Sequence, residues 1–198
     1  MEVRQGVLIL ATAGLLAGCA GTTAPAAQPT GAPASSPASA PASAPVAHPT
    51  ESSPPGDIPD NTVYVAYRHP GQQYEVKVPE GWARTDLATG ASFTDKLNSV
   101  RVETGAATAS PSPDSVRGQI TGDILKTDTV SRKGGTAIRI VYRADSPPDP
   151  VTGKVVRDEI ERYVFYRNGH EAILTLTGPV GADNVDPWQT VSDSFRWL

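Results

Sequence analysis

Two histidines, His69 and His170, are the first candidates for chemistry, because histidine is the side chain that most often transfers protons in enzymes. His69 precedes Pro70-Gly71 and His170 follows Asn168-Gly169, so both are expected beside exposed turns. No Gly-x-Ser-x-Gly nucleophile motif accompanies them. Neither has a second histidine four residues away, the spacing of a zinc site on a helix. We therefore expect no catalytic residue, no cofactor, no bound metal and no enzyme activity.

Oxygen ligands of the kind that Ca²⁺ prefers gather in the loop from Asp145 to Gly153 and in the three acids that follow it, Asp158, Glu159 and Glu161. The loop contains three prolines and does not match the calcium loop of an EF-hand. Acids and arginines alternate with apolar residues on the adjoining predicted strands. We therefore expect cross-strand ion pairs rather than a cation site, with the arginines Arg139, Arg143, Arg157, Arg162 and Arg167 as partners.

Cys19 is the single cysteine of the chain and follows an apolar segment. Residues Val7–Leu16 are apolar or small and come after Arg4, which is the pattern of a secretory signal. A ten-residue helix spans about 15 Å, against about 30 Å of membrane hydrocarbon, so this segment is too short for a transmembrane anchor. We expect residues 1–18 to be a signal peptide that is removed.

The end of that segment, Leu16-Ala17-Gly18-Cys19, resembles the lipobox of bacterial lipoproteins. The resemblance implies cleavage before Cys19 and lipidation of its sulfur by a diacylglycerol, with palmitate among the acyl chains. Two long chains hold a protein on a bilayer stably, whereas a single myristoyl chain does so only marginally. The resemblance therefore places the chain on the outer, extracytoplasmic face of the cell membrane.

Residues 20–60 form a segment of low complexity that follows Cys19. Of its 41 residues 34 are Ala, Pro, Ser, Thr or Gly, and none is aromatic. Such a segment buries too little apolar surface to offset the entropy lost on ordering it. We expect residues 19–60 to be a disordered, lipidated tether, reaching from about 35 Å as a coil to about 125 Å as polyproline II. Recognition by a Pro-binding domain and glycosylation of its hydroxyls are alternatives that do not exclude this role.

Residues 61–198 contain every aromatic residue of the chain and are expected to form one globular domain. Their 16 Lys and Arg against 17 Asp and Glu leave a net charge of -1, and the whole chain has a net charge of -4. This balance excludes a nucleic-acid binder that neutralises many phosphates. One cysteine also excludes an intrachain disulfide and a cysteine-based zinc site. We expect a monomer.

Alternation of apolar and polar residues predicts an antiparallel sheet. The run 155–167, the pair Asn168-Gly169 and the run 170–177 predict two strands joined by a type I′ hairpin. A similar hairpin is expected at Gly134-Gly135, between 129–132 and 136–144. Further strands are predicted at 63–67, 74–78, 91–94 and 100–104.

Two helices are expected beside this sheet. Ser112-Pro113-Asp114 begins the first, and Val116, Ile120 and Ile124, with Leu125, then recur on one face. The second begins at Asp186-Pro187, and Trp188, Val191 and Phe195 form its apolar face, which we expect to pack on the sheet.

Three segments in order resemble the PsbP-like α/β/α sandwich, a fold shared by photosystem II extrinsic proteins, a small nuclear-import factor family and actinobacterial lipoproteins of the LpqN type. They are 74–82 (Tyr-Glu-Val-Lys-Val-Pro-Glu-Gly-Trp), 93–95 (Phe-Thr-Asp) and 191–195 (Val-Ser-Asp-Ser-Phe). The resemblance implies an α+β fold in which helices flank an antiparallel sheet. It transfers no ligand site to this chain, because the domain has no cysteine and no cluster of metal ligands.

The sequence favours a non-enzymatic binding or assembly module whose partner is an envelope protein or glycolipid. One alternative is a lipid or glycolipid carrier, with a groove between sheet and terminal helix near Trp82, Tyr163, Phe165 and Trp188. Another is a hydrolase whose site residues are dispersed along the chain. A large apolar pocket would favour the carrier, and a polar cleft joining His170 to a serine and an acid would favour the hydrolase.

Overall fold

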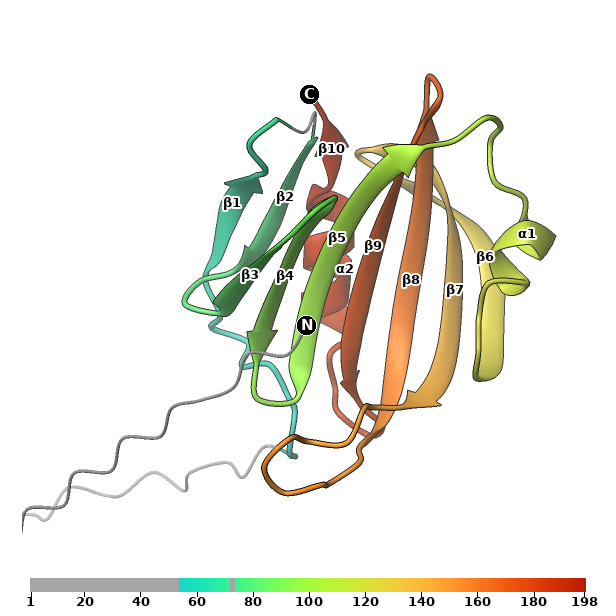
Figure 1. Cartoon of the computed structure of the whole chain (residues 1–198). Coiled ribbons are helices and arrows are strands. Elements are labelled where there is room, and N and C mark those ends of the chain that lie inside the picture. The colour runs from blue at the N-terminus through green and yellow to red at the C-terminus, as the bar shows by residue number, and fades with distance from the viewer. Residues whose placement is uncertain (1–53, 72–73) are drawn as a thin grey trace, which may run out of the picture. The chain divides into compact units, whose positions relative to one another are not determined.

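The computed structural model describes residues 54–71 and 74–198, all of which belong to one compact unit. The expected signal peptide, Cys19 and most of the expected tether lie outside the described residues. Within these, the chain forms two antiparallel sheets and two helices (Figure 1). The α+β class expected from the sequence is confirmed.

The larger sheet has seven strands, each hydrogen-bonded antiparallel to its neighbours. From one edge to the other they are β3 (Ala83–Leu87), β4 (Gly90–Asp95), β5 (Asn98–Ala106), β9 (His170–Pro179), β8 (Arg157–Arg167), β7 (Gly135–Asp145) and β6 (Asp123–Arg132). The smaller sheet contains β1 (Tyr64–Arg68), β2 (Tyr74–Pro79) and β10 (Arg196–Trp197), with β2 in the middle.

The two helices cover opposite faces of the larger sheet (Figure 1). Helix α1 (Pro113–Arg117) buries Val116 against Ile138, Ile140 and Val164 on one face. Helix α2 (Val185–Ser194) lies on the other face, where Trp188 and Val191 join the main core with Tyr163 and Phe165. In the part of the chain that the structure describes, no helix is long and apolar enough to cross a membrane.

The Asn-Gly hairpin is confirmed between β8 and β9. Asn168 and Gly169 both have positive φ angles, 50° and 80°, as a type I′ turn requires. Along β9 the side chains alternate between the core, which receives Ala172, Leu174 and Leu176, and the opposite face. This period of two matches the pattern from which the strand was predicted.

The strands predicted around 63–67, 74–78, 91–94 and 100–104 are also confirmed, as β1, β2, β4 and β5. Pro79 is the last residue of β2, and Gly81 follows with φ 80°. Trp82 after this turn is half-buried and packs against the core, as expected of a residue that covers its end.

The first predicted helix is shorter than its apolar pattern indicated. Ser112 caps it as expected, accepting a hydrogen bond from the backbone of Ser115, but the helix ends at Arg117, just before Gly118. Ile124 and Leu125 lie on β6 instead, after Gly122, whose φ is 148°. The helical prediction for Ile120, Ile124 and Leu125 is therefore wrong, because the helix ends after five residues at Gly118 and the chain turns at Gly122 into β6.

The chain end also differs from the prediction of a continuing helix. Phe195 is fully buried, but α2 ends at Ser194 and Phe195 has extended backbone angles (φ -59°, ψ 131°). The chain then turns into β10, where Trp197 pairs with Tyr74 of β2. Strand β10 has two residues and β3 is almost wholly exposed, so neither shows the alternation that predicts a strand.

The folded part begins before the expected boundary between Asp60 and Asn61. Ile58 is 5% exposed and belongs to the main core, and its backbone N–H donates to Oδ1 of Asn184, 2.8 Å away. The carbonyl oxygen of Gly56 accepts from the side chains of Asn98 and Asn184. Part of the expected tether therefore closes the core at the end of the sheet where β5 begins.

Candidate functional site

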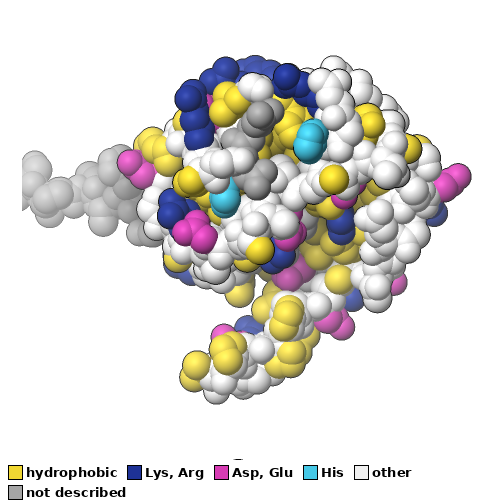
Figure 2. All heavy atoms as spheres, turned by 45° about the horizontal axis from the view of Figure 1, so that its top comes forward, with side chains coloured by type: hydrophobic (Ala, Val, Ile, Leu, Met, Phe, Trp, Pro, Cys, Tyr) yellow, Lys and Arg dark blue, Asp and Glu magenta, His cyan; other side chains and the backbone are white. Residues whose placement is uncertain are grey.

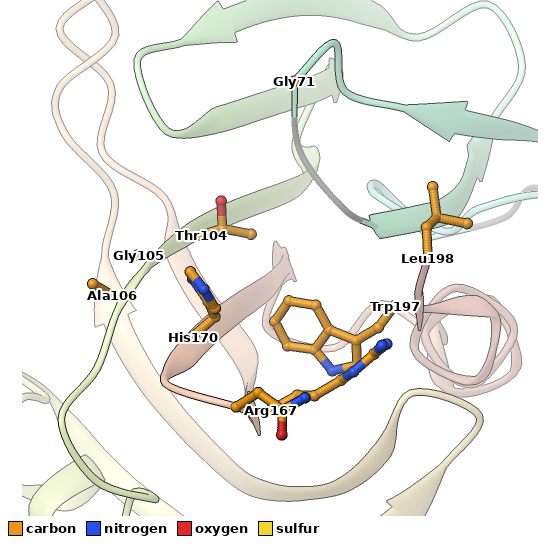
Figure 3. Close-up of a pocket in the computed structure, with 9 residues that line it drawn as sticks. Gly71, Thr104, Gly105, Ala106, Arg167, His170, Trp197 and Leu198 are labelled. Carbon is orange, nitrogen blue, oxygen red and sulfur yellow. The ribbon is translucent and has the colours of Figure 1, made fainter.

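An open cavity of about 410 Å³ lies where the two sheets meet at one end of the domain. Its described lining comes from the end of β5, the β8–β9 hairpin, β10 with the following Leu198, and Gly71 after β1. The side chains with functional groups are those of Thr104, Arg167, His170 and Trp197, which Figure 3 labels, and that of Asn168. The cavity thus collects residues separated by about a hundred positions in the sequence.

Trp197 forms the aromatic wall of this cavity (Figure 3). Pairing of β10 with β2 fixes its backbone, and its ring meets that of Phe195 edge to face, with 5.4 Å between ring centroids. Its Nε1 atom is buried and has no hydrogen-bond partner among the described residues. A buried N–H donor without an acceptor costs stability, so a ligand atom that accepted this hydrogen bond would bind favourably.

Arg167 supplies a cation to the cavity. It is the last residue of β8, it is exposed, and it faces His170 across the hairpin. No carboxylate of the described residues lies within 4 Å of its guanidinium, whereas Arg139 and Arg143 of the adjacent strand β7 are both in ion pairs. Its charge is therefore available to a ligand.

His170 lines the cavity, and its side chain makes no hydrogen bond to any described residue. The Thr104 hydroxyl, also in the lining, donates to the carbonyl of Thr89 at 3.3 Å. The described lining residues include neither a serine nor an acidic side chain, so they hold no side-chain nucleophile–base–acid arrangement around His170. His69 lies outside the lining, where its ring is stacked on that of Tyr74 with 6.5 Å between centroids.

Further cations surround this end of the domain. Figure 2 looks toward it and shows Lys and Arg side chains along one edge, with apolar atoms and both described histidines inside them. Arg68 and Arg196 share the carboxylate of Glu75, and their hydrogen bonds lower the pKa of that carboxyl. Lys133, in the β6–β7 turn, is exposed and forms no ion pair with a described residue. The charge on this rim is therefore positive overall.

The four residues expected to line a groove lie elsewhere. Tyr163 and Phe165 are 1% and 0% exposed and lie under helix α2, whose own Trp188 is 6% exposed and packs into the same core. Trp188 borders a small cavity of about 60 Å³, and Trp82 packs on the edge of the core. A ligand could reach Tyr163 and Phe165 only if α2 moved off the sheet.

The expected cross-strand ion pairs are present on β6, β7 and β8. Arg143 binds Glu159 at 2.8 Å, and Arg139 binds both carboxylate oxygens of Asp128, at 2.9 and 2.8 Å. The hydrogen bonds from Arg139 lower the pKa of Asp128 to about 2. Arg157 pairs with Asp145 and Asp123, whereas Arg162 and Arg167 form no ion pair with a described residue. The expectation of ion pairs is therefore met for three of the five arginines.

The acidic loop binds its own backbone. Oδ1 of Asp149 accepts hydrogen bonds from the backbone N–H groups of Val151 and Thr152 and from the Thr152 hydroxyl. These bonds lower the pKa of the Asp149 carboxyl. Residues 54–71 and 74–198 contain no group of three His, Cys, Asp or Glu side chains placed to hold a metal ion.

Sequence reasoning missed Trp197 and Arg167 as site residues. The Asn-Gly turn already placed Arg167 at the tip of a hairpin, which was a usable signal. Trp197 had no such signal, because its position depends on the two-residue pairing of β10 with β2.

No family model matches the sequence, and no curated protein matches it either. Several solved structures are similar in fold at low sequence identity. The cyanobacterial PsbP protein (CyanoP) of Synechocystis sp. PCC 6803 is 15% identical, with a TM-score of 0.47 over 72% of this chain and 98% of that one. The Ran-binding protein Mog1p of Saccharomyces cerevisiae is 12% identical, with a TM-score of 0.43 over 69% and 96%.

Two further solved structures show the same level of similarity. LpqN of Mycobacterium tuberculosis, described as involved in cell envelope biogenesis, is 12% identical, with a TM-score of 0.41 over 69% of this chain and 91% of that one. A protein of Bacteroides thetaiotaomicron is 11% identical, with a TM-score of 0.43 over 64% of this chain, which spans 45% of that protein's chain. PsbP and LpqN are groups that the sequence segments already resembled, and the likeness concerns the fold alone.

Proposed function

We propose that this chain is a lipid-anchored protein on the outer face of the cell membrane, and that its domain binds another envelope component at the end cavity without chemically changing it. The observation that supports binding is the pairing of a partly buried aromatic wall, Trp197, with an exposed cation, Arg167, that has no acidic partner among the described residues. An open cavity of about 410 Å³ is within the size range of ligand sites.

The proposed anchor rests on the segment Leu16–Cys19 and its similarity to a lipobox. The described chain enters the domain at the end where Gly56 binds Asn98, at the start of β5. The cavity lies at the other end of the same strand, beside Ala106. A domain attached in this way can present its cavity away from the membrane, toward other envelope components.

The alternatives have less support from the geometry. The burial of Tyr163 and Phe165 leaves no open groove for a lipid chain between α2 and the sheet. His170 is in a cavity, but the described lining offers it no serine and no acidic side chain. The lining is instead mixed, with aromatic, cationic and amide groups, which suits recognition of a polar ligand.

Photo-cross-linking in intact cells tests this proposal. A photoreactive phenylalanine analogue replaces His170 in the full-length chain, and in a matched control it replaces Lys96, an exposed cation in the β4–β5 turn at the opposite end. We expect adducts to an envelope component from position 170 and not from position 96. Equal adducts from both positions, or none from position 170, would contradict the proposed binding site.

A further inference from the structure

We infer that the end cavity binds a sugar acid, that is, a pyranose ring carrying a carboxylate or phosphate group, within a saccharide of the envelope. This inference rests on the proposed function, because it names the ligand class of the same site. The carboxylate or phosphate binds Arg167, and the sugar ring lies against Trp197.

The charge of the ligand follows from the cavity's surroundings. Arg167 and Lys133 have no acidic partner among the described residues, whereas Arg68 and Arg196 share Glu75. The nearest other acid on β9, Glu171, borders a different cavity. The planar guanidinium of an arginine matches a carboxylate or phosphate with two parallel hydrogen bonds. A positively charged rim also raises the rate at which anions reach the site.

The ring of the ligand follows from Trp197. One face of a pyranose presents mainly C–H groups, which pack on an indole, while its hydroxyls remain directed outward. Trp197 also holds a buried Nε1 donor without an acceptor, and Figure 3 shows this nitrogen on the side of the ring near Arg167. A ligand oxygen bound between the two groups would give that donor a partner if the exposed Arg167 side chain moved aside.

The hydroxyls of a sugar find partners on the same hairpin. The Asn168 amide and the His170 imidazole line the cavity, and neither side chain is hydrogen-bonded to a described residue. Both can donate and accept. A purely apolar ligand would leave these groups and Arg167 without partners, and a simple inorganic anion would not use the indole.

Calorimetric titration of the mature full-length chain tests the ligand class, with glucuronic acid, glucose 6-phosphate, glucose and inorganic phosphate as probes. We expect both sugar acids to bind at least about ten-fold more tightly than glucose or phosphate alone. Arg167→Gln should weaken the sugar acids by about ten- to a hundred-fold and leave glucose unchanged. Trp197→Leu should weaken every ring-bearing probe, and Lys96→Gln should change none.

Thermal unfolding of each variant provides the folding control. Arg167 is exposed and forms no ion pair with a described residue, so the Arg167→Gln variant should unfold at the same temperature as the wild type. This variant keeps the test decisive even if Trp197→Leu is unstable. Equal binding of glucose and glucuronic acid, or sugar-acid binding that survives Arg167→Gln, would overturn the inference. Binding to phosphatidylinositol vesicles but to neither soluble sugar acid would show that the ligand is a lipid headgroup. It would overturn the inference that the ligand belongs to a saccharide.

The same data separate this inference from the proposed function. Cross-linking of an envelope component at position 170 without binding of any sugar acid would show that the cavity is a binding site for another class of ligand. If position 170 cross-links to no envelope component and no sugar acid binds, the proposed function itself is contradicted.

Discussion

Removing the ring of Phe195 should destabilise the domain more than almost any other single truncation. Phe195 is fully buried at the point where α2 ends and β10 begins. Its ring is stacked on Phe165 with 4.4 Å between centroids, and it also contacts the rings of Tyr74 and Trp197. Truncation of such a ring costs about 3 to 5 kcal/mol, a large part of the roughly 5 to 15 kcal/mol that stabilises a typical domain.

A second substitution tests whether that loss comes from the packing observed here. A Cβ atom on Gly134 would lie 2.5 Å from Cδ1 of Phe195, so Gly134→Ala alone must displace the ring and should cost about 1 to 3 kcal/mol. In a Phe195→Ala chain this ring atom is gone, and the nearest remaining obstacle is the carbonyl oxygen of residue 195, at 3.0 Å. The double variant should therefore lose at least about 1 kcal/mol less than the sum of the single variants.

Urea unfolding followed by circular dichroism measures the free energy of unfolding of the two single variants and of the double variant. Constant m-values would show that the unfolding transition itself is unchanged. Arg196→Ala is the neighbouring control. Arg196 is half exposed and binds Glu75, so we expect a loss of no more than about 1 kcal/mol. Additive effects of Gly134→Ala and Phe195→Ala would refute the packing of the β6–β7 turn on this ring. A Phe195→Ala chain with wild-type stability would refute the burial of Phe195 altogether.

Three further predictions concern other parts of the chain. Cys19→Ser should release the protein from the membrane fraction or leave it unprocessed, and intact-mass measurement should find a diacylglyceryl group on wild-type Cys19; its absence would contradict the proposed anchor. A chain beginning at Asn61 should be less stable than one beginning at Ala20 by about 1.5 to 3 kcal/mol, because it lacks the buried Ile58; equal urea midpoints would contradict this. Asp128→Asn should cost about 1 kcal/mol at pH 7, solvent screening included, because Arg139 lowers the pKa of Asp128 to about 2 in the folded chain. That difference should shrink as the pH falls from about 4 toward 2, where the folded-state carboxyl is protonated, and a difference independent of pH would count against the ion pair.

The strands were predictable from the sequence where one face of the strand is buried. Alternation along 170–177 and the positive φ angles tolerated by Asn168-Gly169 define a hairpin locally, and the structure has it there. Strand β3 has four exposed residues in five, so its sequence contains no period of two. Its position depends on pairing with β4, which no local pattern reveals.

The helices and the site depended on interactions between distant residues. Ile120 and Ile124 do pack on the same face of the sheet as Val116, so their spacing correctly indicated a shared core, although Ile124 reaches it from a strand. The cavity could not be predicted, because it joins β5, β9 and the chain end, and because Trp197 belongs to a two-residue strand. The groove expected between the sheet and the terminal helix is absent because the aromatic rings of the terminal segment themselves fill the core there.

Retention of solubilised envelope material tests the central claim most directly. The mature chain is immobilised through its N-terminal segment, and the mass of bound material is compared for wild type, Lys96→Gln and the double variant Arg167→Gln Trp197→Leu. If the end cavity is the binding site, wild type and Lys96→Gln retain the same component and the double variant, checked for folding, loses it. Retention of that component by the folded double variant would contradict the assignment of the binding site to Arg167 and Trp197.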